Sequence, residues 1–245
     1  MRRTMLLVAV AGMLAAAAGM QIHAQSPAHS PAAHESAAQP PAAQTAAAPA
    51  ATTESPAGKP DLERAQKTAS EVCLACHGPG GNSVVPTNPS LAGQPAEYIS
   101  LQLAHFKAGV RVNPIMQGIA STLQPEDMKA LGIYYSQQQP KPQAAKDAAL
   151  VAAGQKIFRG GDMANGTPAC SACHLPTGAG VAKNYPRVGG QHAEYTYAQL
   201  KAFKSGERGA DKAGKDANGM IMATIAQRLS DAQMKALAEY MSGLR

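Results

Sequence analysis

The chain has 245 residues and a formal net charge of +6, with 45% apolar and only 4% aromatic residues. The apolar fraction is sufficient for a buried core, and the length suits two small domains. The low aromatic content argues against a nucleic-acid partner. Residues 59–140 hold six basic and six acidic residues, whereas residues 141–245 hold 14 basic and eight acidic ones. The basic half therefore suits an acidic protein partner or an anionic membrane surface.

The N-terminus has the pattern of an export signal. Arg2 and Arg3 carry positive charge, residues 5–20 are apolar, and Ala24 suits cleavage by a signal peptidase. A retained membrane anchor is the alternative, but the apolar run is shorter than the roughly 20 residues of a spanning helix. We therefore predict a signal peptide over residues 1–24 and a periplasmic location, where nucleic acid is not encountered.

Two segments of low complexity divide the rest of the chain. Residues 25–60 are rich in Ala and Pro and have no periodic apolar face, which predicts a disordered leader. Residues 139–146 are polar, contain Pro, and predict a linker. Two domains are therefore expected, at 61–138 and 147–245.

These two segments are copies of one module. Cys73 aligns with Cys170 at an offset of 97 residues, and the register holds without a gap as far as Gly109 and Gly206. An insertion of nine residues follows in the second copy. The aligned positions include Pro89 with Pro186, Gly93-Gln94 with Gly190-Gln191, Tyr98 with Tyr195, Gln102 with Gln199, and, beyond the insertion, Met116 with Met222.

Helical periodicity runs through both modules. Amphipathic segments at about 61–72 and 147–158 precede the cysteine pairs, and another helix is expected after each Gly-Gln pair. The last helix starts near Pro125 in the first module and at a Ser230 cap, with Gln233 three residues on, in the second. Because no apolar run alternates, we expect no strand.

All four cysteines lie in two C-x-x-C-H frames, at Cys73/Cys76/His77 and Cys170/Cys173/His174. This pattern is typical of covalent haem attachment. Two thiols on one turn reach the vinyl groups at one porphyrin edge, and the following His is directed toward the iron. The alternatives are disulfides, a C-x-x-C redox pair and a zinc site. The first two need no His at that position, and zinc knuckles lie closer together in sequence.

A haem iron with one His ligand needs a sixth ligand or keeps an open position, and methionine suits ferrous iron. Met116 lies in a stretch interpreted as irregular, residues 113–116, from which a loop could bring its sulfur to the haem. Met128 falls within the final helix and is interpreted as a core residue. Met222 is in register with Met116, and Met220 is interpreted as packing against the haem edge. Met116 and Met222 are therefore the predicted sixth ligands.

Each axial His needs its second ring nitrogen held, usually by a backbone carbonyl. Pro89 and Pro186 either supply that carbonyl or simply form turns, and both interpretations stay open here. Four further histidines are interpreted as structural or as part of the leader, not as ligands: His29, His34, His105 and His192.

Over residues 61–245 the chain resembles the dihaem cytochrome c4 family, in which each C-x-x-C-H frame is followed by Pro, Gly-Gln, Tyr and a distal Met. The motifs that match best are Phe158-Arg159-Gly160-Gly161, Gly189-Gly190-Gln191-His192-Ala193 and Met220-Ile221-Met222. The resemblance implies an all-α protein with two tandem class I cytochrome c domains, each a small helical bundle around one covalently bound haem. It implies two haem c groups with axial pairs His77/Met116 and His174/Met222.

The resemblance also implies an electron carrier, not an enzyme, with redox proteins as partners and no small-molecule substrate. Electrons would pass through a periplasmic respiratory chain, from a cytochrome bc1-type donor toward a terminal oxidase. Peripheral membrane association is compatible with this role. A dihaem enzyme of the peroxidase or thiosulfate-oxidising type is the main alternative, and a cytochrome subunit of a dehydrogenase complex is the second.

Overall fold

A computed structural model describes residues 59–183, 185–210 and 213–245. The predicted signal peptide, the leader, His29 and His34 lie outside these residues. The described part is helical and contains two isolated β-bridges, Asp162 with Thr167 and Val181 with Tyr185, but no strand. No helix among the described residues is long and apolar enough to cross a membrane. The expectation of an all-helical fold is confirmed.

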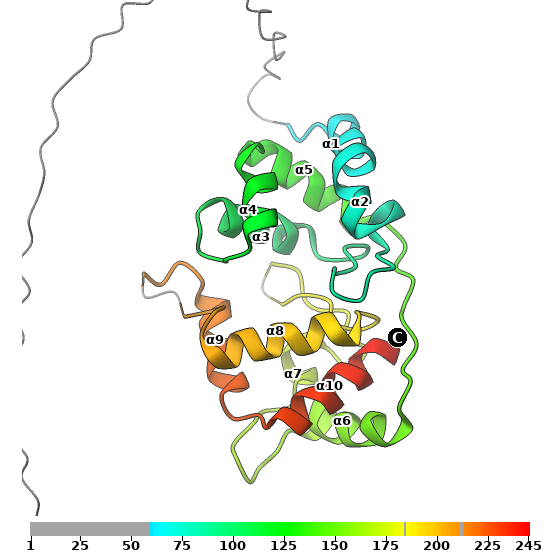
Figure 1. Ribbon diagram of the computed structural model, residues 1–245, viewed down its shortest axis with the longest axis vertical. Coiled ribbons are helices and arrows are strands. Elements are labelled where there is room, and N and C mark those ends of the chain that lie inside the picture. The colour runs from blue at the N-terminus through cyan, green and yellow to red at the C-terminus, as the bar shows by residue number, and fades with distance from the viewer. Residues whose placement is uncertain (1–58, 184, 211–212) are drawn as a thin grey trace, which may run out of the picture. The chain divides into compact units, whose positions relative to one another are not determined.

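The helices of the first domain form two groups in the chain, with a long loop between η2 and α3 (Figure 1). They are α1 (Leu62–Thr68), the π-helix η1 (Ala69–Cys73), α2 (Leu74–His77), the 3₁₀-helix η2 (Pro79–Gly81), α3 (Ala96–Lys107), α4 (Pro114–Ser121) and α5 (Pro125–Ser136). The Asp61 carboxylate caps α1 by accepting from the Arg64 amide, which satisfies one free N–H of the first turn. The α3 helix packs against α5 and α4, and α1 packs against α5.

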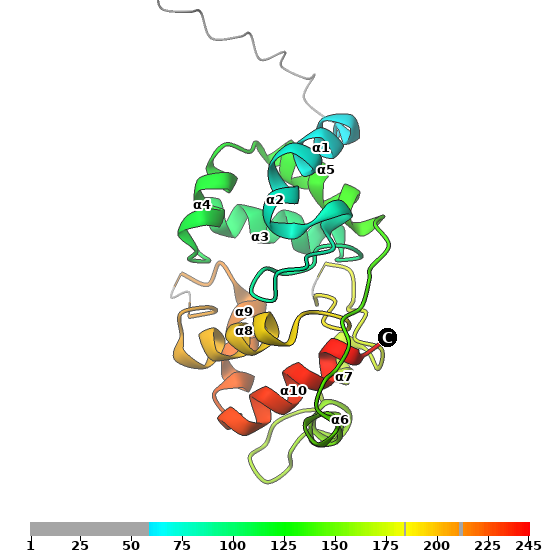
Figure 2. The same cartoon turned by 45° about the vertical axis from the view of Figure 1, so that its right-hand side comes forward.

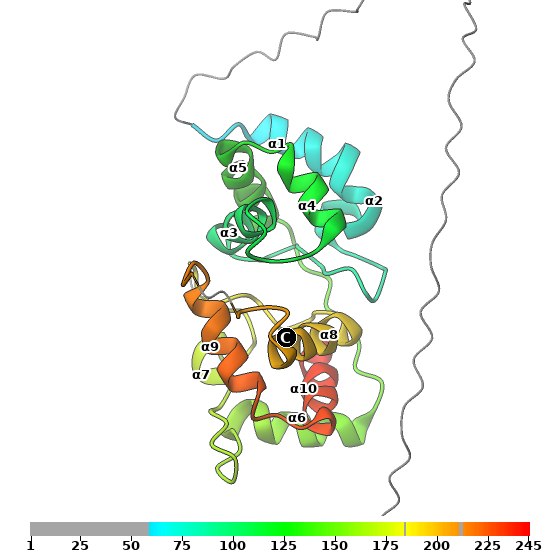
Figure 3. The ribbon, with the colours of Figure 1, turned by 60° about the vertical axis from the view of Figure 1, so that its left-hand side comes forward.

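The second domain repeats this plan. Its helices are α6 (Ala148–Gly160), α7 (Ser171–His174), α8 (Ala193–Ser205), α9 (Ala217–Ala226) and α10 (Asp231–Gly243). The predicted cap of the last helix is present, because Ser230 Oγ accepts from Gln233 N and Gln233 Oε1 accepts from Ser230 N. The α10 helix packs against α6 and α8. Figure 3 shows the two groups of helices, α1–α5 and α6–α10, as separate bodies.

Each domain has its own apolar core. The first core contains Ile99, Leu103, Met128, Leu131 and Tyr135, and the second contains Phe158, Leu200, Leu229, Met234 and Leu237. Met128 is only 3% exposed, so its interpretation as a core residue is confirmed. Burial of these side chains is the main stabilising contribution to each small bundle.

Residues 113–116 differ from the sequence-based expectation, because they form the start of α4 and not an irregular stretch. The Asn113 side chain accepts from the Met116 amide, and Pro114 occupies the first helical position. Both are helix-start signals that outweigh the loop-forming tendency of an Asn-Pro pair. Met116 is therefore held on a helix.

The segment between α5 and α6 is extended and runs along both domains (Figure 2). Asn82 of the first domain accepts from the Lys141 amide at 2.7 Å, and Gln143 N donates to Gly190 O of the second domain at 3.3 Å. The linker predicted at 139–146 lies inside this segment. Its hydrogen bonds fix its path on the two bodies.

Candidate functional site

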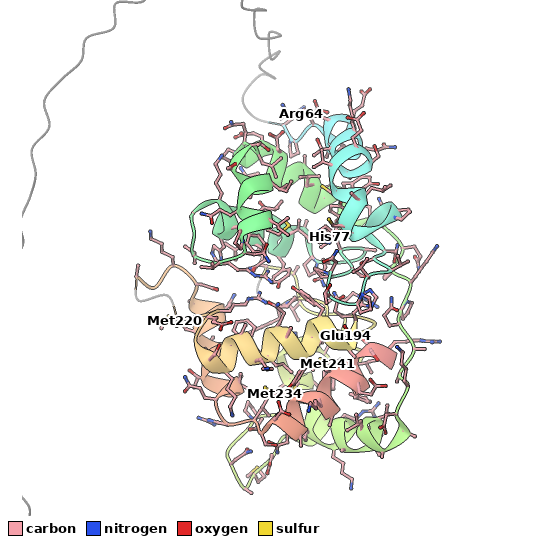
Figure 4. All side chains as sticks on the ribbon, in the orientation of Figure 1. Arg64, His77, Glu194, Met220, Met234 and Met241 are labelled. Carbon is pink, nitrogen blue, oxygen red and sulfur yellow. The ribbon has the colours of Figure 1, made fainter. Side chains whose placement is uncertain are left out.

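The two Cys-x-x-Cys-His frames sit at helix ends. Cys73 is the last residue of η1 and is followed by α2, which ends at His77 (Figure 4). Cys170 precedes α7, which ends at His174. All four cysteines lie in the described part of the chain, and none of them forms a disulfide. In each frame a single helical turn carries two thiols and an imidazole.

Both frame histidines are held in the same way. His77 is 8% exposed and His174 is 7% exposed. The Nδ1 atom of His77 lies 2.9 Å from Pro89 O, and that of His174 lies 2.9 Å from Pro186 O. Because a carbonyl oxygen only accepts, Nδ1 carries the hydrogen and Nε2 keeps its lone pair. The structure thus favours the carbonyl role of the two prolines over simple turn formation.

Burial sets the protonation of these groups. It lowers the pKa of both His77 and His174, although their hydrogen bonds to the proline carbonyls act in the opposite direction. The rings are therefore neutral near pH 7, as a metal ligand must be. Burial also raises the pKa of the Cys73 thiol and raises that of Cys170 to about 11. A redox-active C-x-x-C pair contains a thiol with a lowered pKa, whereas the pKa values of Cys73 and Cys170 shift in the opposite direction.

The two methionines in register occupy equivalent places. Met116 and Cys73 are both partly buried against the apolar core of the first domain, together with Leu91. Met222 and Cys170 are both partly buried against the core of the second domain. Val188, the repeat equivalent of Leu91, lies there too. Each domain therefore brings its first cysteine and its in-register methionine to one apolar cluster.

Met220 lies on α9, two residues before Met222 (Figure 4). Its side chain is 45% exposed, and it belongs to neither apolar cluster. Its predicted packing against the haem edge stays a prediction. Exposure separates it from Met222, which packs against the core of the second domain and against a smaller cluster of Phe203, Ala223 and Ala226.

His105 and His192 lie between the domains, as buried groups away from the two frames. His192 Nε2 lies 2.9 Å from Ser83 O of the first domain. His105 Nδ1 lies 3.8 Å from Asp216 Oδ2 of the second domain. Both residues are 6% exposed, and these contacts support the interpretation of both as structural histidines.

Two arginines that the sequence analysis did not single out cross the same interface. Arg111 donates to Gln102 of its own domain and to Tyr195 and Gln199 of the other. Arg208 makes the equivalent set of contacts, donating to Gln199, Tyr98 and Gln102. The signal was available, because Arg208 follows Arg111 at the repeat offset of 97 residues.

The hydrogen-bond acceptors around these guanidinium groups are neutral oxygens. Burial disfavours the charged form of Arg111, yet the neighbouring Tyr195 and Tyr98 raise its pKa overall. Burial alone would raise the pKa of Tyr195, but the two arginines lower it. Arg208 Nε is buried and has no hydrogen-bond partner. Positive charge is therefore concentrated in the interior, where the buried Asp216 carboxylate also raises the pKa of Arg111.

Comparison with known proteins agrees with this arrangement. The cytochrome c family model matches residues 151–245, and the model of cytochrome c oxidase, cbb3-type, subunit III matches residues 60–134. Cytochrome c4 of Thiocapsa roseopersicina is 44% identical over 187 residues, which cover 75% of this chain and 93% of that protein.

Two further similarities are informative. The thiosulfate dehydrogenase electron acceptor of Thiomonas intermedia (strain K12) is 40% identical over 173 residues, covering 69% of this chain and 77% of that protein. The crystal structure of reduced recombinant cytochrome c4 from Pseudomonas stutzeri is similar with a TM-score of 0.69 and 38% identity. That match covers 76% of this chain and 99% of the solved one. The similarity thus spans both helical domains.

Proposed function

Because this chain belongs to the cytochrome c4 family and carries two haem c groups, we propose that it transfers electrons in the periplasm from a cytochrome bc1-type donor toward a terminal oxidase. Members of this family are electron carriers, so the chain is an electron carrier and not an enzyme. We propose in addition the direction of transfer, the periplasmic compartment and the two named partners.

We assign the covalent attachment of the two haems to Cys73 and Cys76 and to Cys170 and Cys173. The axial pairs would be His77 with Met116, and His174 with Met222. One observation carries this assignment: in each domain the first cysteine and the in-register methionine pack on the same apolar cluster. The nearby imidazole leaves Nε2 free, because Nδ1 is held by a proline carbonyl.

When bound, haem c supplies an iron that gains and loses one electron. The chain's own residues keep that centre dry and fixed. The apolar cores exclude water, the proline carbonyls hold the rings, and the methionine thioethers favour the ferrous form. A site that rearranges little between redox states suits a carrier.

The buried Arg111 and Arg208 suit the edge of a haem that carries its carboxylates. Haem carries two carboxylates, and these would stabilise two guanidinium groups whose direct hydrogen-bond acceptors are neutral and which have Asp216 as a nearby carboxylate. The unpartnered Nε of Arg208 is an orphaned donor that a carboxylate oxygen could satisfy. We therefore propose Arg111 and Arg208 as the counter-charges for the haem carboxylates.

The excess of basic residues in 141–245 supports docking of an acidic redox partner on the second domain. Peripheral membrane association would use the same basic surface against anionic lipid. A second role, as the acceptor of electrons from a thiosulfate-oxidising enzyme, is favoured by the similarity to a relative with that name.

Spectroscopy of the purified holoprotein tests the ligand assignment. We expect two haems per chain by pyridine haemochrome, the near-infrared-edge band of ferric Met ligation at both, and no reaction with carbon monoxide. The M116A and M222A variants should each lose about half of that band. An unchanged band in either variant would overturn the assignment, and one wild-type haem that binds carbon monoxide would favour a dihaem enzyme.

The direction of transfer is tested separately. The reduced protein should be oxidised rapidly by membranes that contain a terminal oxidase, and the oxidised protein should be reduced by a bc1-type complex. Fast reduction by a thiosulfate dehydrogenase with thiosulfate, and slow reduction by the bc1-type complex, would instead support the second role. Mass spectrometry of the periplasmic fraction should show a chain that begins after Ala24.

A further inference from the structure

Two buried glutamines connect the domains by reciprocal hydrogen bonds. Gln94 of the first domain accepts from Arg187 N at 3.0 Å through Oε1 and donates to Arg187 O at 2.7 Å through Nε2. Gln191 of the second domain accepts from Ser90 N at 2.9 Å and donates to Ser90 O at 3.0 Å. Gln191 Oε1 also accepts from His192 N at 3.1 Å. The two glutamines are 6% and 7% exposed.

The residues that the glutamines bind directly follow the prolines that hold the axial histidines. Pro89 C=O and Ser90 N–H belong to one peptide group, as do Pro186 C=O and Arg187 N–H. Gln191 therefore accepts a hydrogen bond from the peptide N–H whose carbonyl oxygen accepts from His77, in the opposite domain. Gln94 in turn accepts a hydrogen bond from the peptide N–H whose carbonyl oxygen accepts from His174.

Hydrogen bonds on the two ends of one peptide polarise each other. When the N–H donates, electron density on the carbonyl oxygen rises, and that oxygen becomes a stronger acceptor. A stronger bond from Nδ1–H makes the imidazole a more basic ligand, which stabilises the ferric form of an attached haem. Loss of the glutamine would have the reverse effect and raise the reduction potential.

We propose that Gln94 and Gln191 are positioning residues, each of which tunes the haem of the domain to which it does not belong. The proposal rests on the assignment of His77 and His174 as axial ligands. Because both glutamine contacts form only while the domains are docked, the potentials of the two haems become linked to the interface between them.

A purely structural role of the two glutamines predicts a different pattern of reduction potentials. If the glutamines only hold the domains together, loss of either would shift both potentials by similar amounts or neither. If each acts within its own domain, the haem of that domain would respond. Only the crossed pattern distinguishes tuning through the shared peptide.

The test is a redox titration of the holoprotein with haem signals resolved by NMR. Gln191→Met removes both hydrogen bonds while keeping side-chain volume, and it should raise the potential of the haem beside His77. We expect about a threefold change in the equilibrium constant for electron transfer between the two haems. This corresponds to a difference of about 28 mV at 59 mV per tenfold. Gln94→Met should raise the potential of the haem beside His174 instead. Exposed Gln66→Met and Gln155→Met are the matched controls, one in each domain.

Amide hydrogen exchange gives a second readout. In Gln191→Met the Ser90 amide should exchange faster while the Arg187 amide stays protected, and Gln94→Met should show the converse. Shorter amides, Gln191→Asn and Gln94→Asn, should shift the potentials in the same crossed directions if the Met variants separate the domains. Equal, absent or same-domain shifts in both variant pairs would overturn the proposal. Absence of the Met band in the wild type would count against Met116 and Met222 as ligands, not against the role of the glutamines.

Discussion

The two domains present the same Cys-x-x-Cys-His frame on differently built supports. In the first, α1, η1 and α2 form one unbroken helical path from Leu62 to His77. In the second, α6 ends at Gly160, and a loop closed by the Asp162–Thr167 bridge separates it from α7 (Figure 1). The frame and the residues after it keep the repeat register, whereas the route into the frame does not. The two domains therefore share the arrangement of the two thiols and the imidazole, but not the chain path that leads to them.

The residue after the axial His shows a second difference. Gly78 has φ 73°, and its repeat equivalent Leu175 has φ 67° with ψ 158°. Such angles cost a non-Gly residue about 1–3 kcal/mol. The sharp turn out of the frame is thus required in both domains, but only the first uses the residue that adopts it without strain.

The largest expected effect comes from removing one attachment site at a time. C73S/C76S and C170S/C173S should each leave one haem per chain in a pyridine haemochrome assay. Because the first frame is continuous with α1, its loss should also remove exchange protection from α1. The α6 helix should stay protected in the second variant, since it packs mainly on α10 and only slightly on α7. Equal loss of protection in α1 and α6 would contradict this difference.

The crossing between the first and last helices should also respond differently to substitution in the two domains. A Cβ at Gly154 of α6 would collide with Ala236 O and lie 2.7 Å from Tyr240 Cβ, whereas α1 carries the buried Ala65 in its crossing with α5. Gly154→Ala should therefore lower the free energy of unfolding of the second domain by about 2 kcal/mol. Gly160→Ala is the matched control, because nothing lies within 4 Å of its Cβ. Thermal unfolding followed by haem absorption measures both, and equal stability would contradict the close approach.

Substitutions of Gly78 and Leu175, which follow the axial histidines, test the difference in backbone strain between the two domains. Gly78→Ala should destabilise the first domain by about 2 kcal/mol, because of its positive φ and a collision with Asn82 O. Leu175→Gly should stabilise the second domain by up to about 1 kcal/mol as strain is relieved. Denaturant unfolding of the two variants should give midpoints that move in opposite directions. A fall in both midpoints would show that Leu175 gains more from its contacts than it loses to strain.

The smallest expected effect tests the charge difference between the domains. Electron exchange with an acidic redox protein should slow about tenfold between roughly 0.01 M and 0.15 M salt, because screening weakens steering. The exposed pair Lys156→Gln/Lys201→Gln in the second domain should reduce that dependence about twofold. Lys67→Gln/Lys129→Gln in the first domain is the control. Rates that do not change with ionic strength would refute docking on the basic domain.

Much of this arrangement was predictable because it is local. The frames, the repeat offset, the helix after each Gly-Gln pair and the Ser230 cap follow from spacing within a few turns of chain. The register of Met222 with Met116 also needed only the repeat. The error at residues 113–116 was local too, since Asn113 and Pro114 form a helix start that was interpreted as a loop.

The sequence by itself determined which residues could attach haem and how many domains would carry them, because those properties depend on side-chain type and short spacing. Only the tertiary structure decided that the proline carbonyls hold the histidines, that Arg111 and Arg208 meet the opposite domain, and that each glutamine reaches the other domain's proline peptide. The hydrogen bonds between the domains join residues 84–110 positions apart. No local preference encodes such pairs, since they form only when two folded bodies dock face to face.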